Sequence, residues 1–552
     1  MSQDPLLLIL IPWVAALPPL IGKALGRRMP FAWISVVIFA ASGIPLWRVW
    51  RVLSEAPESL TPYFLGGWPP PLGIALGVDW LALVLGAVVL VIVLAISVTS
   101  LAQPHFSNLY FAEVMILAGG LQGVLVVQDL FTLFVLFEIA ALAVYLLIAY
   151  EREAAALVAS FKYLILSSLG ILFFLFGIFV VYRETGILAL SGPFTVPPGS
   201  ERALNLGVAA LVVGIGVRTA FIPFHTWLPE AHAYAPHPIS ALLSGVVIKV
   251  SFFAMVRVID AFEATYFYEP LLWIGAATAF IAVLRALAQR DVKKLLAYHS
   301  ISQMGYVLAA FGVASLVGRE AAVHHAVNHA LFKSLLFLTV GYAVSLSGSR
   351  DVYRIPKLGR REPVMAVAFW LGALAIAGIP PLNGYFSKAD VSKAVQEAAL
   401  SPYIYPFIWA TGAGTVASFI KLGRIYSFLR PGRAAGLRGG SPHADATGSS
   451  IAAVRGTAGR RGLIRRIGTL APPAALGGLC LAGGLVMGLP SLPSLASTGI
   501  TVAAGVGVFV AISRPGVARV LAPLRRWNPS LEAVLTFFFL GLFLFAAVGY
   551  LN

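Results

Sequence analysis

Apolar stretches long enough to cross a lipid bilayer dominate the chain. About 20 consecutive apolar residues span the ~30 Å hydrocarbon core of a membrane. We count about sixteen stretches near that length: 5–25, 31–53, 76–101, 109–127, 130–149, 156–181, 206–221, 238–259, 271–288, 294–317, 322–346, 364–399, 405–428, 467–489, 500–512 and 531–551. Since 59% of the 552 residues are hydrophobic and 11% are charged, the sequence predicts an all-α polytopic membrane protein with about 14–16 transmembrane helices.

The basic residues between these stretches predict the orientation, because cytoplasmic loops are enriched in Lys and Arg. Every basic cluster follows an odd-numbered stretch, which places both termini outside: Lys23, Arg27 and Arg28; Arg290 and Lys293; Arg350, Arg354, Lys357, Arg360 and Arg361; 430–466; Arg514, Arg519, Arg525 and Arg526. The net charge of +16 therefore indicates topology and contact with anionic lipid, and it argues against nucleic-acid binding. No cleavable signal peptide is expected.

Composition divides the chain into four regions. Residues 1–76 hold N-terminal helices and an outward loop, and 77–430 form a core. Residues 431–466 are rich in Gly, Ala, Ser and Arg, which predicts a basic cytoplasmic linker. Residues 467–552 form C-terminal transmembrane helices, and the single cysteine, Cys480, excludes an iron–sulfur cluster held by this chain alone.

Two features of the core favour an internal repeat. The sequence FKYL around Lys162 is echoed 171 residues later by FKSL around Lys333, and Arg218 and Lys388 are 170 residues apart. An odd number of spans separates the members of each pair, so the two halves would be inverted, as in many transporters. Prolines near Arg218 and Lys388 predict breaks in the seventh and twelfth helices, because proline cannot donate a backbone hydrogen bond.

Ionisable residues inside apolar stretches are the strongest functional signal. A charge at membrane depth costs several kcal/mol, so such residues are rare unless they serve a function. Three of the candidates, His325, His329 and Lys333, are spaced by four residues and are expected on one helix face, a pattern that suits a proton relay. The proposed site residues are Glu138, Arg218, Lys249, His325, His329, Lys333 and Lys388.

These residues leave several interpretations open. Glu138 needs a basic partner, for which Lys162, Arg218 and Lys249 are available. The loop histidines His225, His232 and His237, with Glu230, favour a proton entrance or loop packing over a metal site, because no zinc motif is present. We expect no metal and no cofactor. A transporter of an organic solute and a membrane b-haem oxidoreductase remain as alternatives.

Four motifs resemble one membrane family. They are IPFHTWLPEAH at 222–232, followed by PISALL and Lys249; DVKKLLAYHSISQMGY at 291–306; HALFK at 329–333; and GIPPLNG at 378–384. Over residues 77–428 the chain is similar to the antiporter-like subunits shared by respiratory complex I (NADH:quinone oxidoreductase), Mrp-type sodium/proton antiporters and membrane-bound hydrogenases, and it looks most like the D-type Mrp subunit or its hydrogenase counterpart.

The resemblance implies two inverted five-helix repeats and a hydrated, charged axis along the middle of the membrane. It assigns Glu138, Lys249, Lys388 and the helix with His325, His329 and Lys333 to that axis. Arg218 stands where the family has lysine, and arginine does not readily release a proton.

The implied protein is a proton-conducting subunit of a hetero-oligomeric cation/proton antiporter, with sodium as the expected cation. It would have no redox site of its own and would reside in a bacterial cell inner membrane. The alternative is a proton-pumping subunit of a complex I-like NADH:quinone oxidoreductase or an energy-converting hydrogenase.

Overall fold

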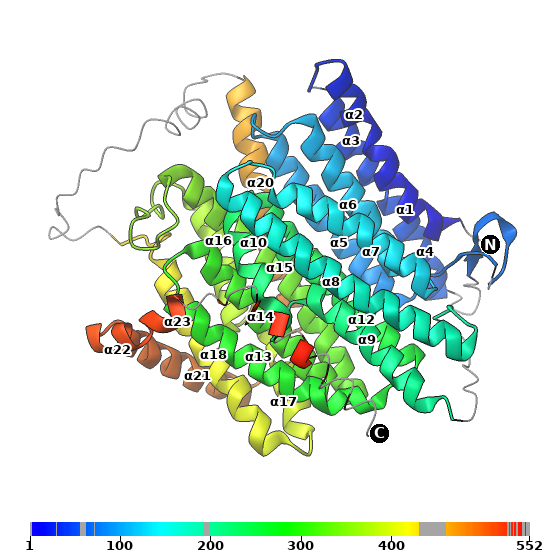
Figure 1. Cartoon of the computed structure of the whole chain (residues 1–552). Coiled ribbons are helices and arrows are strands. Elements are labelled where there is room, and N and C mark those ends of the chain that lie inside the picture. Colours follow the sequence, from blue (N-terminus) through cyan, green and yellow to red (C-terminus); the bar gives the residue numbers. More distant parts are fainter. Residues whose placement is uncertain are drawn as a thin grey trace.

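The computed structural model describes residues 3–28, 30–55, 62–70, 72–190, 199–429, 460–488 and 490–526, with isolated positions between 529 and 547. Most of these residues are in helices that run side by side (Figure 1). The N-terminal region contains four helices, a short 3-10 turn and a two-stranded antiparallel sheet: α1 (Asp4–Ala15), α2 (Leu17–Ala24), α3 (Phe31–Ala40), α4 (Gly43–Glu55), β1 (Tyr63–Phe64), η2 (Leu65–Gly67) and β2 (Ala75–Leu76).

The core begins at α5 and ends at α18. Its elements are α5 (Trp80–Leu101), α6 (Asn108–Val126), α7 (Leu130–Ile148), α8 (Ala154–Thr185), α9 (Glu201–Thr219), η3 (Phe224–Trp227), α10 (Leu228–Tyr234), α11 (His237–Leu242), η4 (Leu243–Val247), α12 (Ile248–Ala261), η5 (Thr265–Phe267), α13 (Tyr268–Ala288), α14 (Val292–Phe311), α15 (Leu316–Ser347), α16 (Pro363–Ala377), α17 (Asn383–Glu397) and α18 (Ser401–Gly423). Asp129, Asp291 and Ser315 cap the N-termini of α7, α14 and α15, since each side chain accepts hydrogen bonds from first-turn N–H groups.

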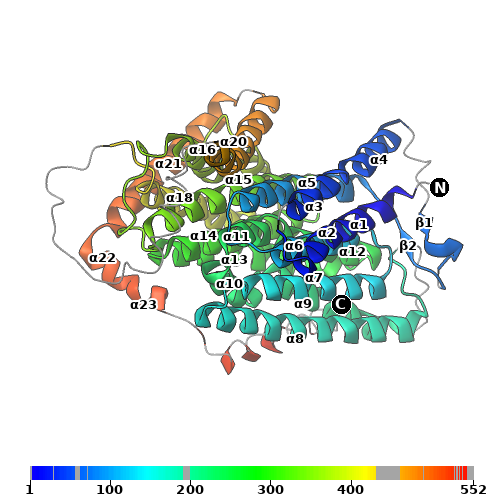
Figure 2. The ribbon, with the colours of Figure 1, turned by 90° about the horizontal axis from the view of Figure 1, so that it is seen from above.

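The C-terminal region contains α20 (Arg460–Val486), α21 (Leu492–Ile512), α22 (Pro515–Val520) and α23 (Ala522–Arg526). Helix α20 packs against α5, α15 and α16, and Figure 2 shows it beside α15 and α16. It begins inside the range expected for the linker, of which 431–459 lies outside the described residues. The last expected span, 531–551, lies largely outside them as well.

Twelve helical stretches in the described part are long and apolar enough to cross a membrane. Helices α14 and α18, and the pair α16 and α17, occupy the positions of three further stretches expected from the sequence. These observations confirm an all-α, multi-pass integral membrane protein. The inverted repeat inside the core remains a prediction.

Both expected helix breaks are present. Helix α9 ends at Thr219, and Ala220 follows with a left-handed φ of 60° before the chain re-enters helix in η3 and α10. Helix α16 ends at Ala377 and is followed by Gly378, whose φ of 76° favours glycine, and α17 begins at Asn383 after the paired prolines. Arg218 lies just before the first break and Lys388 just after the second.

Small residues allow the central helices to approach closely. An ideal Cβ on Gly275 of α13 would lie 2.3 Å from the backbone nitrogen of Ala309 on α14, and one on Gly305 would lie 2.3 Å from that of Ala279. Glycine at a helix interface brings backbones together in membrane proteins, where apolar side chains gain little by leaving lipid. The α13–α14 pair thus forms a close-packed wall beside α15, which carries three of the expected site residues.

Candidate functional site

Glu138 and Arg218 form an ion pair between α7 and α9. The Nη2 atom of Arg218 lies 3.0 Å from Oε1 of Glu138, and Nη1 donates a hydrogen bond of 3.0 Å to the carbonyl of Phe137. The Arg218 side chain is 6% exposed and the Glu138 side chain is 44% exposed. Among the three basic residues that the sequence offered to Glu138, the structure selects Arg218.

Lys162 pairs with Glu230 instead. Its Nζ atom lies 3.3 Å from Oε2 of Glu230, which links α8 to α10 just beyond the first helix break. Both side chains are largely buried. Two ion pairs, Glu138–Arg218 and Lys162–Glu230, therefore lie on the two sides of the same break.

Lys249 lies in the first turn of α12, directly after a π-helical turn, η4, that the sequence did not predict. Its Nζ atom donates a hydrogen bond to the carbonyl of Ser244, which the widened turn leaves available. Gly245 in the same turn faces α15 so closely that an ideal Cβ would lie 2.1 Å from Oγ of Ser334. The glycine therefore brings Lys249 next to the helix that carries Lys333.

Lys333 is fully buried on α15. Its Nζ atom donates a hydrogen bond of 2.5 Å to the carbonyl of Leu296 on α14 and lies 4.9 Å from the ring centroid of Phe337. Within the described residues, no carboxylate lies within 4.0 Å of the amino groups of Lys249, Lys333 or Lys388. Burying an ammonium without an anion costs several kcal/mol, so these positions are expensive to maintain for packing alone.

His325 and His329 lie on one face of α15, as the four-residue spacing predicts. The rings of His325 and His329 are nearly parallel, at 14°, with centroids 6.2 Å apart. His325 contacts Ser387 Oγ through Nδ1 and Gln303 Oε1 through Nε2, each at 3.1 Å. Both His329 nitrogens are buried and have no hydrogen-bond partner in the described part of the chain. A bridging water would suit that spacing.

Lys388 continues the series onto α17. Its Nζ atom lies 5.1 Å from the ring centroid of Tyr306, and that ring lies 5.6 Å from the ring of His325. The Cδ atom of Lys388 would lie 3.2 Å from a Cβ on Gly378, so the glycine at the break also leaves room for the lysine stem. Lys249, Lys333, His329, His325 and Lys388 therefore form a buried series from α12 through α15 to α17.

The loop histidines contact different neighbours. His232 stacks on Phe337 with ring centroids 4.5 Å apart, and Nε2 of His237 lies 3.3 Å from Nε2 of Gln103. His225 lies in η3, beside a cavity that also contacts Glu230. These contacts therefore do not bring the three histidine side chains together at one site.

Sequence reasoning missed two polar groups beside this series. His299 on α14 is fully buried, with no hydrogen-bond partner for either nitrogen among the described residues. His324 on α15 pairs with Asp390 on α17, at 2.6 Å between Nδ1 and Oδ2. The polar run from Tyr298 to Gln303 inside an expected span could have directed attention to His299.

Comparisons with known proteins identify the family of the chain. Residues 127–413 match the family described as "NADH:quinone oxidoreductase/Mrp antiporter, TM". The chain is 32% identical over 400 residues to the N-type subunit of NADH-quinone oxidoreductase from Desulforudis audaxviator, covering 70% of this chain and 78% of the relative. It is 29% identical over 361 residues to the D-type subunit of the Na(+)/H(+) antiporter from Alkalihalophilus pseudofirmus, covering 63% and 73%.

A solved structure shares the fold. A chain in the structure of the Mrp complex from Dietzia sp. DQ12-45-1b superposes with a TM-score of 0.74 at 23% identity, covering 95% of this chain and all of that one. The family match spans just over half of the sequence and contains all seven proposed site residues. The chain therefore belongs to the NADH:quinone oxidoreductase/Mrp antiporter family of transmembrane subunits.

Proposed function

We propose that the chain is the proton-conducting, antiporter-like subunit of a multi-subunit cation/proton antiporter, with sodium as the exchanged cation. The observation that carries this proposal is the buried series of lysines and histidines between α12 and α17. The chain is similar to a D-type Na(+)/H(+) antiporter subunit over 361 residues, which supports antiport as the activity. Within such a complex, this chain would move ions and would carry out no redox reaction.

Protons would move along the series by changes of charge at neighbouring groups. A change at the Glu138–Arg218 pair alters the electrostatic cost of a proton on Lys249, and each later group responds to the one before it. Imidazole rings can accept a proton at one nitrogen and release it from the other, which suits His329 and His325 between Lys333 and Lys388. Waters would bridge the gaps that exceed hydrogen-bond distance.

Arg218 has a different role from the lysines. A guanidinium keeps its proton in proteins, so Arg218 supplies a fixed positive charge. Glu138 can then change partner or proton occupancy against that fixed charge. The pair works as an electrostatic switch, and the transferable protons are carried by the lysines and histidines.

The exposure of Glu138 supports a hetero-oligomer. Its side chain is 44% exposed in the middle of α7, where Phe131, Val135 and Leu142 are also exposed apolar side chains. A carboxylate facing hydrocarbon is costly, so a partner subunit is expected to cover this face. The neighbouring subunit would thereby gain direct electrostatic contact with the switch.

A second function remains, in which a redox module drives the same proton path. The identity of 32% to the N-type subunit of NADH-quinone oxidoreductase favours it. Both functions require the same charged series and differ in the partner subunits.

Purification of the tagged chain in mild detergent, followed by mass spectrometry of the co-purifying chains, separates the two. Small membrane partners and other antiporter-like chains would establish the antiporter. Iron–sulfur or nickel-bearing partners would instead identify the chain as the proton-pumping subunit of a redox-driven complex. Sodium-dependent proton movement in vesicles carrying the complex then tests transport, and a Lys249→Met variant with undiminished exchange would contradict the proposed path.

A further inference from the structure

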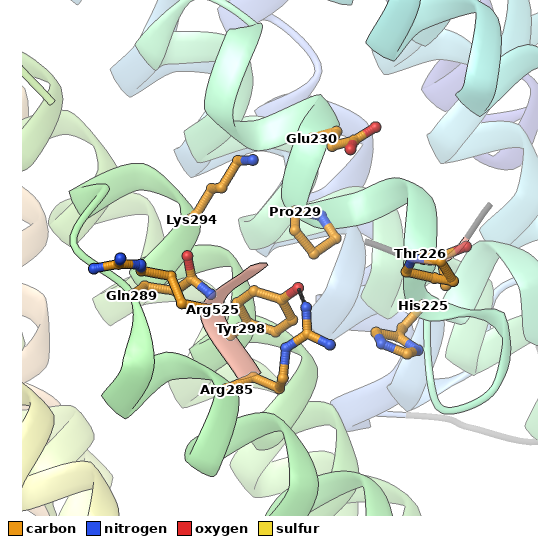
Figure 3. A pocket seen from close by; sticks show the side chains of 10 residues that line it. His225, Thr226, Pro229, Glu230, Arg285, Gln289, Lys294, Tyr298 and Arg525 are labelled. Carbon is orange, nitrogen blue, oxygen red and sulfur yellow. Dashed lines mark hydrogen bonds between the residues drawn. The ribbon is translucent and has the colours of Figure 1, made fainter. Parts of the chain in front are cut away.

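A partly open cavity of about 50 Å³ lies where α13 ends and α14 begins (Figure 3). Three parts of the chain that are far apart in the sequence line it: η3 with α10, the junction from the end of α13 to the start of α14, and the C-terminal region. Its residues are His225, Thr226, Pro229, Glu230, Arg285, Gln289, Lys294, Tyr298, Arg525 and Pro529. The proposed proton path does not use this cavity.

The lining carries an excess of positive charge. Arg285, Lys294 and Arg525 are cationic, and the single carboxylate, Glu230, already pairs with Lys162. Arg285 is 4% exposed, and its Nη2 atom donates a 2.6 Å hydrogen bond to the hydroxyl of Tyr298, which fixes the guanidinium beside the cavity (Figure 3).

Polar groups accompany the cations. The Oγ1 atom of Thr226 is buried and has no hydrogen-bond partner among the described residues. The side chain of Gln289 also lines the cavity and is 5% exposed. Buried polar atoms normally have partners, so the unpaired hydroxyl points to a ligand or a water in this space.

The position matches the cytoplasmic leaflet. Arg290, between α13 and α14, and Lys293, in the first turn of α14, form one of the basic clusters that the predicted topology places on the cytoplasmic side. Helix α23, which carries Arg525, packs against α13. The cavity therefore lies at the level where anionic lipid headgroups gather, between transmembrane helices and a basic C-terminal segment.

We propose that this cavity binds a phosphate group, either the headgroup of an anionic lipid or a free phosphate ion. Guanidinium groups bind phosphate oxygens through paired hydrogen bonds, and Lys294 adds a third positive charge. The hydroxyl of Thr226 supplies a neutral donor. Because Arg525 comes from the C-terminal segment, the bound phosphate ties that segment to the core.

Binding is tested on the full chain, purified with its partner subunits and placed in nanodiscs of phosphatidylcholine alone or of phosphatidylcholine mixed with phosphatidylglycerol. Inorganic phosphate is titrated into the first kind of disc. The thermal unfolding midpoint reports binding, because a ligand that binds the folded state raises it. A rise with phosphatidylglycerol identifies the lipid headgroup as the ligand, and a rise with phosphate alone identifies the free ion.

Arg525→Gln is the test variant and Arg519→Gln is its matched control, since Arg519 lies on α22 and does not line the cavity. We expect Arg525→Gln to need about fivefold more ligand for the same shift, the factor that corresponds to roughly 1 kcal/mol per basic residue near a membrane surface. Arg519→Gln should respond as the unmodified chain does. Lys294→Gln gives a second measurement if Arg525→Gln does not assemble.

Two results would overturn the proposal. One is an unfolding midpoint of the unmodified chain that neither ligand changes. The other is an equal loss of response in Arg525→Gln and Arg519→Gln, which would show general attraction to a basic surface. Neither measurement depends on transport, so failure here leaves the proposed antiport untouched, and loss of antiport would leave this site untouched.

Discussion

Replacing Glu138 by Gln is the sharpest test of the proposed switch. Glutamine keeps an oxygen that can accept the hydrogen bond from Arg218, and it removes the negative charge. Losing one member of a buried ion pair costs about 3–5 kcal/mol. Because the Glu138 side chain is 44% exposed, we take the lower value of about 3 kcal/mol, which changes an equilibrium constant about a hundredfold. Coupled exchange should fall by a similar factor.

The assay is sodium-dependent proton movement in inverted membrane vesicles from cells that lack other antiporters, followed with a pH-sensitive dye. Co-purification of the partner subunits checks that Glu138→Gln still assembles. Glu184→Gln is the matched control, because Glu184 pairs with Arg183 at the end of α8, away from the buried series. Exchange by Glu138→Gln at half the normal rate or more, with normal assembly, would refute the switch.

Three further substitutions test individual contacts. Arg218→Lys should retain exchange in the vesicle assay because it keeps the positive charge, whereas a severe loss would show that the two hydrogen bonds of the guanidinium are required. Lys421→Met should lower the thermal unfolding midpoint, with a cost of about 2 kcal/mol, because Nζ donates to the carbonyls of Leu287 and Gln289 at the end of α13; an unchanged midpoint would contradict this. Gly245→Ala should cost about 1–3 kcal/mol and reduce exchange by moving Lys249, whereas Gly499→Ala, with open space around its Cβ, should behave normally.

The sequence predicted the fold class well because membrane spans are set by length and hydropathy. The breaks at Ala220 and Gly378 were also predictable, since prolines follow both positions. The common face of His325 and His329 followed from helical periodicity alone. In each case the feature depends on residues close together in the sequence and not on how the helices pack against one another.

Partner choice was not predictable in the same way. Three basic residues were available to Glu138, and which one pairs with it depends on how α7 and α9 pack. The π turn before Lys249 has no clear sequence signal, although it exposes the Ser244 carbonyl that accepts the lysine hydrogen bond. The His324–Asp390 pair also required tertiary contact, because its members are on α15 and α17.

The positions of arginine and lysine separate the residues that control the proposed path from the residues that carry its protons. Arg218, which holds its proton, pairs with Glu138, whose side chain is 44% exposed. The groups of the buried series between α12 and α17 are lysines and histidines, which can exchange protons. Because Arg218 keeps its proton, its ion pair with Glu138 can form or break without Arg218 releasing a proton to the path. Control by a partner subunit would therefore act through electrostatics at Glu138, while proton transfer stays within Lys249, Lys333, the histidines and Lys388.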